Sequence, residues 1–204
     1  MIRIAKILLA GLFALGIALM PTAANAAGLD VDYDASGSSY IASTGSTVDI
    51  APTTLSTTIE SADGSITGHM PLKPATSEFK IIGLLPVKAT VHFDEAAPIT
   101  GSLINEGNTT RVESTASYYI RLSDVRVAGL PVYVGDKCQT KDPVSIPANT
   151  PEGEQFDIVN GGELHGEYTI GDFHHCFIQT WLLNLLIPGS GNTVDLNVTN
   201  GRLG

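Results

Sequence analysis

Apolar and polar residues alternate with a period of two over most of the chain. In VKATVHF, residues 87–93, the two Val, the Ala and the Phe would lie on one face, with Lys, Thr and His on the other. This alternation is typical of a β-strand with one wet face, and it favours antiparallel pairing. It recurs in the segments 47–50, 66–72, 118–122, 125–127, 132–134, 164–170 and 194–198. So many short strands predict an all-β fold, an antiparallel β-sandwich, with a small β-barrel as the alternative.

Two segments depart from this pattern. Residues 27–44 join an acidic stretch, DVDYD, to a run rich in Ser and Gly, and we predict a partly ordered N-terminal arm there. Residues 177–187, FIQTWLLNLLI, are apolar on both alternating faces, so they fit either a buried strand or a short helix. These 11 residues are too few to span a bilayer. The chain from 45 to 204 is predicted to form one all-β domain.

The first 26 residues have the order of a secretory signal peptide. Arg3 and Lys6 precede an apolar run at 7–20, and the small-residue sequence Ala24-Asn25-Ala26 follows it. The run has 14 residues, fewer than the roughly 20 that a membrane-spanning helix needs. We therefore expect cleavage after Ala26 and a mature chain without a transmembrane segment. Its expected place is outside the cell or at the cell envelope.

The chain is strongly acidic. It has 11 Lys and Arg against 21 Asp and Glu, a formal net charge of −10. Because Arg3 and Lys6 lie in the signal segment and no acidic residue does, the mature chain would carry nine basic residues and a net charge of −12. The long-range field of a chain this acidic repels nucleic acid and anionic lipid head groups, so we expect no non-specific binding to either.

Cys138 and Cys176 are the only cysteines of the chain. An even count in an oxidising compartment predicts one disulfide between them. The bond would close a loop of 39 residues. In the chain-entropy account, a loop of this length corresponds to about 4 kcal/mol of stabilisation.

A series of short motifs resembles a group of secreted β-rich domains of actinobacteria that has no assigned activity. The motifs are STV at Ser46, GSITGHMPL at Gly64, PATSEFK at Pro74, GLLPVKATVHF at Gly83, PITGSL at Pro98, VAGLPVYVGDKC at Val127, GGELHGEYTI at Gly161 and IPGSGNTV at Ile187. They cover residues 45 to 198, in an order more specific than any single motif. The resemblance implies an exported all-β domain with a single disulfide, and it transfers no catalytic residue.

Metal and calcium sites are the first chemistry that the sequence suggests. In DFHHCF, residues 172–177, His174 and His175 would point to opposite faces of a regular strand, and an oxidised Cys176 could not bind a metal. We predict no metal or cofactor, and the role of the two histidines stays open. The acidic DVDYD lacks the glycine and glutamate of a calcium-binding loop.

A binding surface is the more favoured chemistry. The apolar side chains of Leu84, Leu85, Trp181, Leu182 and Leu185 exceed what turns require. They either fill the core or form a patch or pocket for lipid, envelope or a partner protein. We therefore expect an exported, non-catalytic binding or structural protein, whose partner is an unidentified envelope component, a protein or lipid. The alternative is a carrier of a hydrophobic ligand such as lipid, with an enclosed apolar cavity near Trp181 and Leu85.

An enzyme is the least favoured interpretation. The sequence contains no nucleophile elbow and no zinc-protease helix motif. Glu163 and Glu167 flank His165 on one face of a predicted strand, an arrangement that a carbohydrate-active hydrolase could use. Acidic residues on the wet face of a strand are common without any catalytic role.

Overall fold

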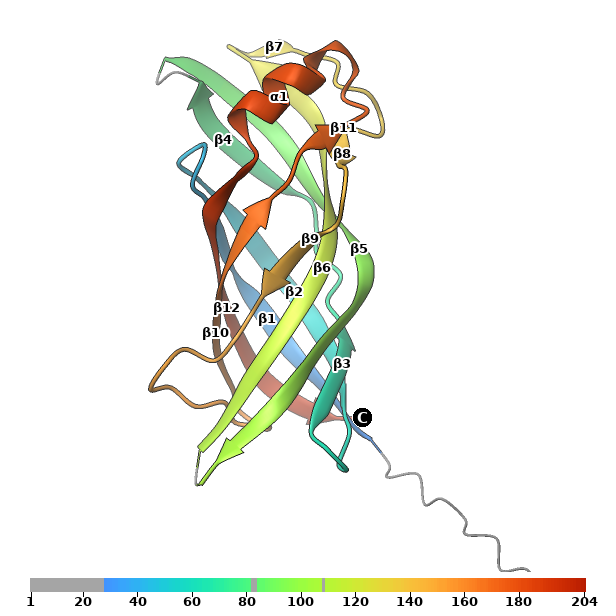
Figure 1. Ribbon diagram of the computed structural model, residues 1–204, viewed down its shortest axis with the longest axis vertical. Coiled ribbons are helices and arrows are strands. Elements are labelled where there is room, and N and C mark those ends of the chain that lie inside the picture. Colours follow the sequence, from blue (N-terminus) through green and yellow to red (C-terminus); the bar gives the residue numbers. More distant parts are fainter. Residues whose placement is uncertain (1–27, 82–83, 108) are drawn as a thin grey trace, which may run out of the picture.

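The structure, a computed structural model, describes residues 28–81, 84–107 and 109–204 (Figure 1). The predicted signal segment, 1–26, lies outside these residues. The elements are, in chain order, β1 (Leu29–Ile41), β2 (Ser46–Ile59), β3 (Ser65–His69), β4 (Ala75–Ile81), β5 (Leu85–Glu106), β6 (Thr109–Val127), β7 (Leu130–Pro131), β8 (Gln139–Thr140), β9 (Val144–Pro147), β10 (Gly161–Ile170), β11 (Phe173–His174), η1 (Phe177–Gln179), α1 (Thr180–Leu186) and β12 (Gly189–Leu203).

All strands belong to one antiparallel sheet. Its order is β10-β12-β1-β2-β3-β5-β6-β8-β11, while β4 pairs with β5, and β7 and β9 pair with β6. The long strands curl the sheet around an apolar interior, with β5 and β6 in front of β1, β2 and β12 in Figure 1. The predicted antiparallel all-β fold is confirmed, and so is the Cys138–Cys176 disulfide.

The two ends of the sheet meet without forming a continuous ladder. Asn149, just after β9, makes a single bridge with His165 of β10, through two backbone hydrogen bonds of 2.8 Å. A Cβ at Gly166 would overlap the carbonyl oxygen of Pro147, so only glycine permits β9 to pass this close to β10. The sheet is therefore not closed into a barrel, and its facing halves pack like the two layers of a sandwich.

The segment predicted as an N-terminal arm forms an interior strand of the sheet instead. Strand β1 pairs along its length with β2 on one edge and with β12 on the other. Val31, Tyr33 and Ala35 are each only 2% exposed, because they alternate with aspartates that face solvent. The prediction for 27–44 is thus corrected over β1, where a period-two pattern lies within the acidic stretch.

The ambiguous segment 177–187 is helical. A short turn, η1, leads into α1, which is held to β11 through one side chain. Asn184 Oδ1 accepts a hydrogen bond of 2.6 Å from the backbone N–H of Phe173, and its Nδ2 donates one of 3.0 Å to the Phe173 carbonyl. Within the part of the chain that the structure describes, no helix has the length and apolar character to cross a membrane.

One predicted strand is wrong. Residues 132–134 form no strand, because β7 covers only Leu130–Pro131 and the chain then leaves the edge of β6. The last antiparallel contact is a hydrogen bond of 2.8 Å from Val132 N–H to the Val125 carbonyl. The other six alternating segments and 87–93 all fall on strands, although β3 ends at His69 rather than at residue 72.

Candidate binding surface

A group of apolar side chains projects from one end of the molecule. We call it the apolar cap; its members are Leu84, Leu130, Tyr133, Phe177, Ile178, Trp181 and Leu185. Each of them is between 65% and 86% exposed. They come from the β4–β5 turn, from β7 with the loop after it, and from η1 with α1, which lie together at the top of Figure 1.

Most of the predicted patch belongs to this cap. Leu84, Trp181 and Leu185 are cap members, and Leu85 beside them is 41% exposed. Leu182 is half-buried and contributes less surface. Sequence reasoning missed Leu130 and Tyr133, which lie in irregular chain, and Phe177 and Ile178. Phe177 could have been found from the sequence, because Phe177, Trp181 and Leu185 recur every four residues, a spacing that predicts one face of a helix.

The backbone around Cys176 explains why Phe177 points outward. His175 and Phe177, on either side of the cysteine, have φ angles of 55° and 56°, in the left-handed region that non-glycine residues seldom adopt. Cys176 itself is fully buried in its bond to Cys138. The disulfide thus holds a backbone turn that brings the Phe177 ring to Tyr133, with centroids 5.9 Å apart in an edge-to-face arrangement.

Helix α1 has two apolar faces with different environments. Leu183, and Ile187 just after the helix, are each 9% exposed and line a cavity of the interior. Trp181 and Leu185, on the other side of the helix, are 70% and 73% exposed. The helix therefore covers the interior with one face and forms part of the apolar cap with the other.

Charge is distributed unevenly along the molecule. Near the cap lie Lys80, Arg126 and Lys137, which are exposed and form no ion pair with any described residue. The exposed carboxylates of Asp124 and Asp136 lie on the same segments, two residues from Arg126 and one residue from Lys137. Lys88 is paired, because its Nζ lies 2.8 Å from Glu78 Oε1. Carboxylates dominate the opposite end, where Asp30, Asp32, Asp34, Glu60, Asp63, Glu106, Glu113, Glu152, Glu154, Asp157 and Glu163 are found with only Arg111 and Arg202. The end that bears the cap is therefore close to neutral.

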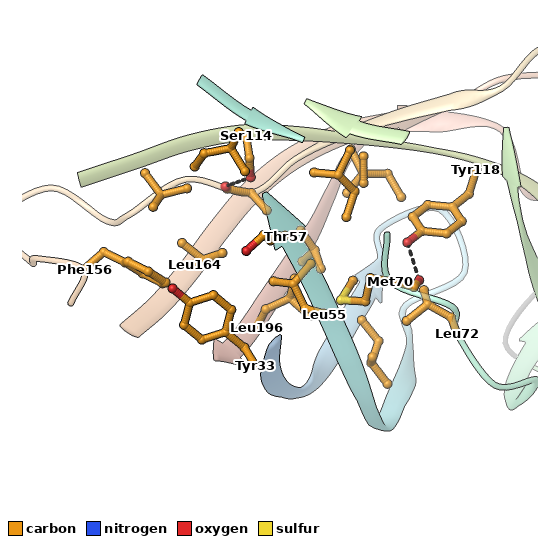
Figure 2. A pocket seen from close by; sticks show the side chains of 18 of the residues that line it. Tyr33, Leu55, Thr57, Met70, Leu72, Ser114, Tyr118, Phe156, Leu164 and Leu196 are labelled. Atoms are coloured by element: carbon orange, nitrogen blue, oxygen red, sulfur yellow. Dashed lines mark hydrogen bonds between the residues drawn. The ribbon is translucent and has the colours of Figure 1, made fainter. Parts of the chain in front are cut away.

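The interior contains two small apolar cavities. One of about 80 Å³ lies between the curled halves of the sheet (Figure 2). A second, of about 60 Å³, lies toward α1. Both are lined by Ser39, Phe93 and Tyr168, so these side chains separate one cavity from the other. Trp181 and Leu85, near which a carrier's cavity was predicted, line neither of them.

The hydroxyl groups that border the larger cavity all have partners. Tyr118 donates a hydrogen bond of 2.7 Å to the Met70 carbonyl (Figure 2). Tyr33 donates one of 2.8 Å to the Ile158 carbonyl. Tyr168 and Ser39 share a hydrogen bond of 2.7 Å. Burial raises the pKa of Tyr33 to about 12, with a further contribution from the Asp157 carboxylate, and burial also raises the pKa of Tyr118. The interior thus presents no charge and no free polar group that could orient a polar ligand.

The histidines beside Cys176 do not point to opposite faces, as a regular strand would require. Strand β11 ends at His174, and the left-handed conformation of His175 brings the two rings side by side, with centroids 4.1 Å apart. Among the residues that the structure describes, no three His, Cys, Asp or Glu side chains gather in a group that could hold a metal ion.

The carboxylates of DVDYD are spaced along the solvent side of β1 rather than gathered. Thr58 Oγ1 donates a hydrogen bond of 2.7 Å to Asp30 Oδ1, and Asp34 lies 2.9 Å from the Arg202 guanidinium. Hydrogen bonds from Arg202 and Asn200 lower the pKa of Asp34. These partners make the aspartates part of the strand surface, without a common point to which all three are directed.

The possible hydrolase residues are also on the surface. Glu163, His165 and Glu167 face solvent from β10, and His165 Nδ1 lies 2.7 Å from Asp195 Oδ1 of the neighbouring strand. The general acid of a glycosidase works from a desolvated site, whereas these three side chains are exposed. The pair has the geometry of cross-strand polar contacts.

Comparison with known proteins finds no matching protein family, no matching curated protein and no matching solved structure. The resemblance to secreted actinobacterial domains therefore stays a prediction. The interpretation of the surface depends on its own geometry.

Proposed function

We propose that the protein is exported and acts without catalysis, as a binding protein of the cell envelope or extracellular space, with the apolar cap as its contact surface. The observation that carries this proposal is the gathering of seven highly exposed apolar side chains at one end of the fold. Exposed apolar surface is unfavourable in water and is commonly retained for an interaction. The Cys138–Cys176 disulfide supports the extracellular location, since such bonds persist in oxidising compartments.

Retention on the cell envelope tests this proposal. Envelope fragments from the native host are incubated with the parent protein and with a cap variant, Leu84→Ser with Leu185→Ser, and the bound fraction is measured after washing. The matched control is Val159→Ser with Leu203→Ser. Those residues are 61% and 65% exposed but lie at the other end of the molecule.

The cap variant should lose most of its retention, because the apolar area that leaves water on binding is reduced. The control should bind like the parent. Equal retention of all three proteins, or no retention of the parent, would overturn the proposal.

A carrier of a hydrophobic ligand is the second candidate, favoured by the two apolar cavities. Their size argues against lipid, because an engineered cavity of about 150 Å³ holds only benzene, and drug-sized ligands need roughly 300 Å³ or more. Intact-mass analysis of protein purified from its host under native conditions separates the two functions. We expect the mass of the polypeptide alone, whereas a stoichiometric bound lipid would favour the carrier.

A further inference from the structure

We propose that the apolar cap inserts into the surface of a fluid lipid bilayer. This inference rests on the proposed function and names the partner of the same surface. The net charge alone predicts repulsion from anionic membranes. This expectation is revised because the negative charge is concentrated at the end opposite the cap.

The shape of the cap favours a fluid partner. Its side chains belong to three separate chain segments, and each is at least 65% exposed, so no groove encloses them, although the rings of Tyr133 and Phe177 pack edge to face. A protein partner would have to fit closely around these protruding side chains, since protein interfaces are packed as densely as protein interiors. Acyl chains adapt to any shape, and burying a Leu or Phe side chain among them is favourable.

The chemical composition of the cap points the same way. Leu84, Ile178 and Leu185 are purely apolar, whereas Trp181 and Tyr133 each combine a large ring with a polar atom. Aromatic side chains of that kind are enriched at the level of lipid head groups, where one end is apolar and the other is wet. The cap therefore offers both groups that enter hydrocarbon and groups that settle at its boundary.

The charge distribution orients the molecule toward a membrane. Lys80, Arg126 and Lys137 beside the cap are nearly balanced by exposed carboxylates such as Asp124 and Asp136, so the cap end is not repelled by a membrane surface. The carboxylate-rich end lies at the other extreme of a long fold, beyond the roughly 8–10 Å over which charge acts in physiological salt (Figure 1). Approach with the cap foremost is therefore the favoured orientation.

A second copy of the chain is another candidate partner for the cap. Two-fold pairing of cap on cap would bring together two ends whose cations and carboxylates nearly balance, so charge gives this pairing no driving force. The surface charge therefore does not select a second copy as the partner.

The base of the cap is rigid enough to insert without unfolding. The disulfide fixes the chain before η1, the two hydrogen bonds of Asn184 fix α1 to β11, and Leu183 anchors the inner face of the helix. Little conformational entropy is then lost on binding, because the exposed side chains are already presented.

Trp181 provides a direct reporter, since it is the only tryptophan of the chain. The protein without residues 1–26 is titrated with vesicles of phosphatidylcholine, with and without phosphatidylglycerol, and Trp181 emission is followed. Binding should shift the emission to shorter wavelength, and lipids brominated on their acyl chains should quench it. The response should appear with phosphatidylcholine alone and persist in high salt, because burial of apolar side chains drives it.

Three variants make the result specific. Leu84→Ser with Leu185→Ser should weaken vesicle binding by roughly tenfold or more, because two apolar side chains no longer enter the membrane. Val159→Ser with Leu203→Ser should bind like the parent. The triple change Lys80→Glu, Arg126→Glu and Lys137→Glu makes the cap end strongly negative. It should weaken binding to anionic vesicles, while binding to phosphatidylcholine vesicles stays like that of the parent because the cap side chains are intact.

The outcomes separate this inference from the proposed function. If the parent shows no shift with any vesicle, yet its envelope retention still depends on the cap, the partner is a protein and the bilayer is excluded. If concentrated protein dimerises through the cap without binding vesicles, the partner is a second copy. Equal vesicle binding by the cap variant and the control would show that the cap is not the membrane contact.

Discussion

At the scale of single residues, the interior depends on hydroxyl groups that are buried and satisfied. Tyr118 is 2% exposed, and its hydroxyl donates to the Met70 carbonyl, while Tyr33 donates to the Ile158 carbonyl. Ionisation would place a negative charge in an apolar interior, which is why burial raises the pKa of both groups. In the unfolded chain both groups ionise near pH 10.

We predict that stability is lost at alkaline pH through these tyrosines. Their folded pKa values are raised, so their contribution is fully present below pH 10 and declines as the pH rises from 10 toward 12. Denaturant titrations below and above pH 10 should show this fall in the free energy of unfolding. Tyr118→Phe should lower stability by about 1–3 kcal/mol at neutral pH, because the Met70 carbonyl loses its partner, and should flatten the alkaline fall.

The control for this prediction is Tyr133→Phe, since Tyr133 is 65% exposed. Its stability should follow that of the parent at every pH. A Tyr118→Phe variant with the full alkaline dependence of the parent would contradict the assignment.

At the scale of elements, the hydrogen bonds between α1 and β11 come from the side chain of Asn184. Its amide makes the pair of backbone hydrogen bonds that a neighbouring strand would make, because it both accepts from and donates to the backbone of Phe173 in β11. The helix has only seven residues, too short to be stable through its own backbone hydrogen bonds. Its position therefore comes from Asn184, from Leu183 below it and from the disulfide beside it.

We predict that Asn184→Ala lowers the free energy of unfolding by about 1–3 kcal/mol, because two backbone groups of Phe173 lose their partners. In the variant, hydrogen exchange should become faster than in the parent within residues 177–187, and this increase should be larger there than in β5 and β6. Asn197→Ala is the matched control, because Asn197 is exposed on β12, and it should change stability by less than about 0.5 kcal/mol. Unaltered exchange in 177–187 would contradict the role of Asn184.

How far the elements could be predicted depended on the range of the interactions involved. Alternation in 87–93 or 164–170 is local, so it identified strands correctly. In β1 the same alternation continues into a run of Ser and Gly, where Ser39 is buried and shares a hydrogen bond with Tyr168, 129 positions away. A local sequence pattern cannot predict that contact. Likewise the apolar excess around Leu84 and Trp181 predicts either core filling or a patch. Only the fold shows that these side chains are exposed and that Tyr133 lies beside Phe177 in the same cap.

At the scale of the whole molecule, a single sheet that curls without closing leaves space inside. The larger cavity, about 80 Å³, is lined by Ala116 of β6 among other apolar side chains. The side chains that line a void make fewer dispersion contacts than they would in a filled core, so the free energy of unfolding is lower than that of a fully packed interior.

We predict that Ala116→Val raises the free energy of unfolding by about 0.5–2 kcal/mol, because its methyl groups occupy this cavity. Ala51→Val is the control, since Ala51 is exposed on β2 and Val there gains strand propensity without filling a void. Denaturant titration of the three proteins gives the comparison. A destabilised Ala116→Val protein would mean that the space cannot accept a larger side chain.

The place of β1 between β2 and β12 has a consequence for how the chain acquires its structure. Val31 is in register with Leu203, so one edge of β1 stays unpaired until β12 is available. Such a large sequence separation slows folding, because a long loop must close before the contacts can form. In a chain delivered from its N-terminus, β1 would be half-paired and its apolar face exposed until β12 arrived. Slow completion of the sheet is compatible with the export that we propose, in which the chain crosses a membrane before it folds.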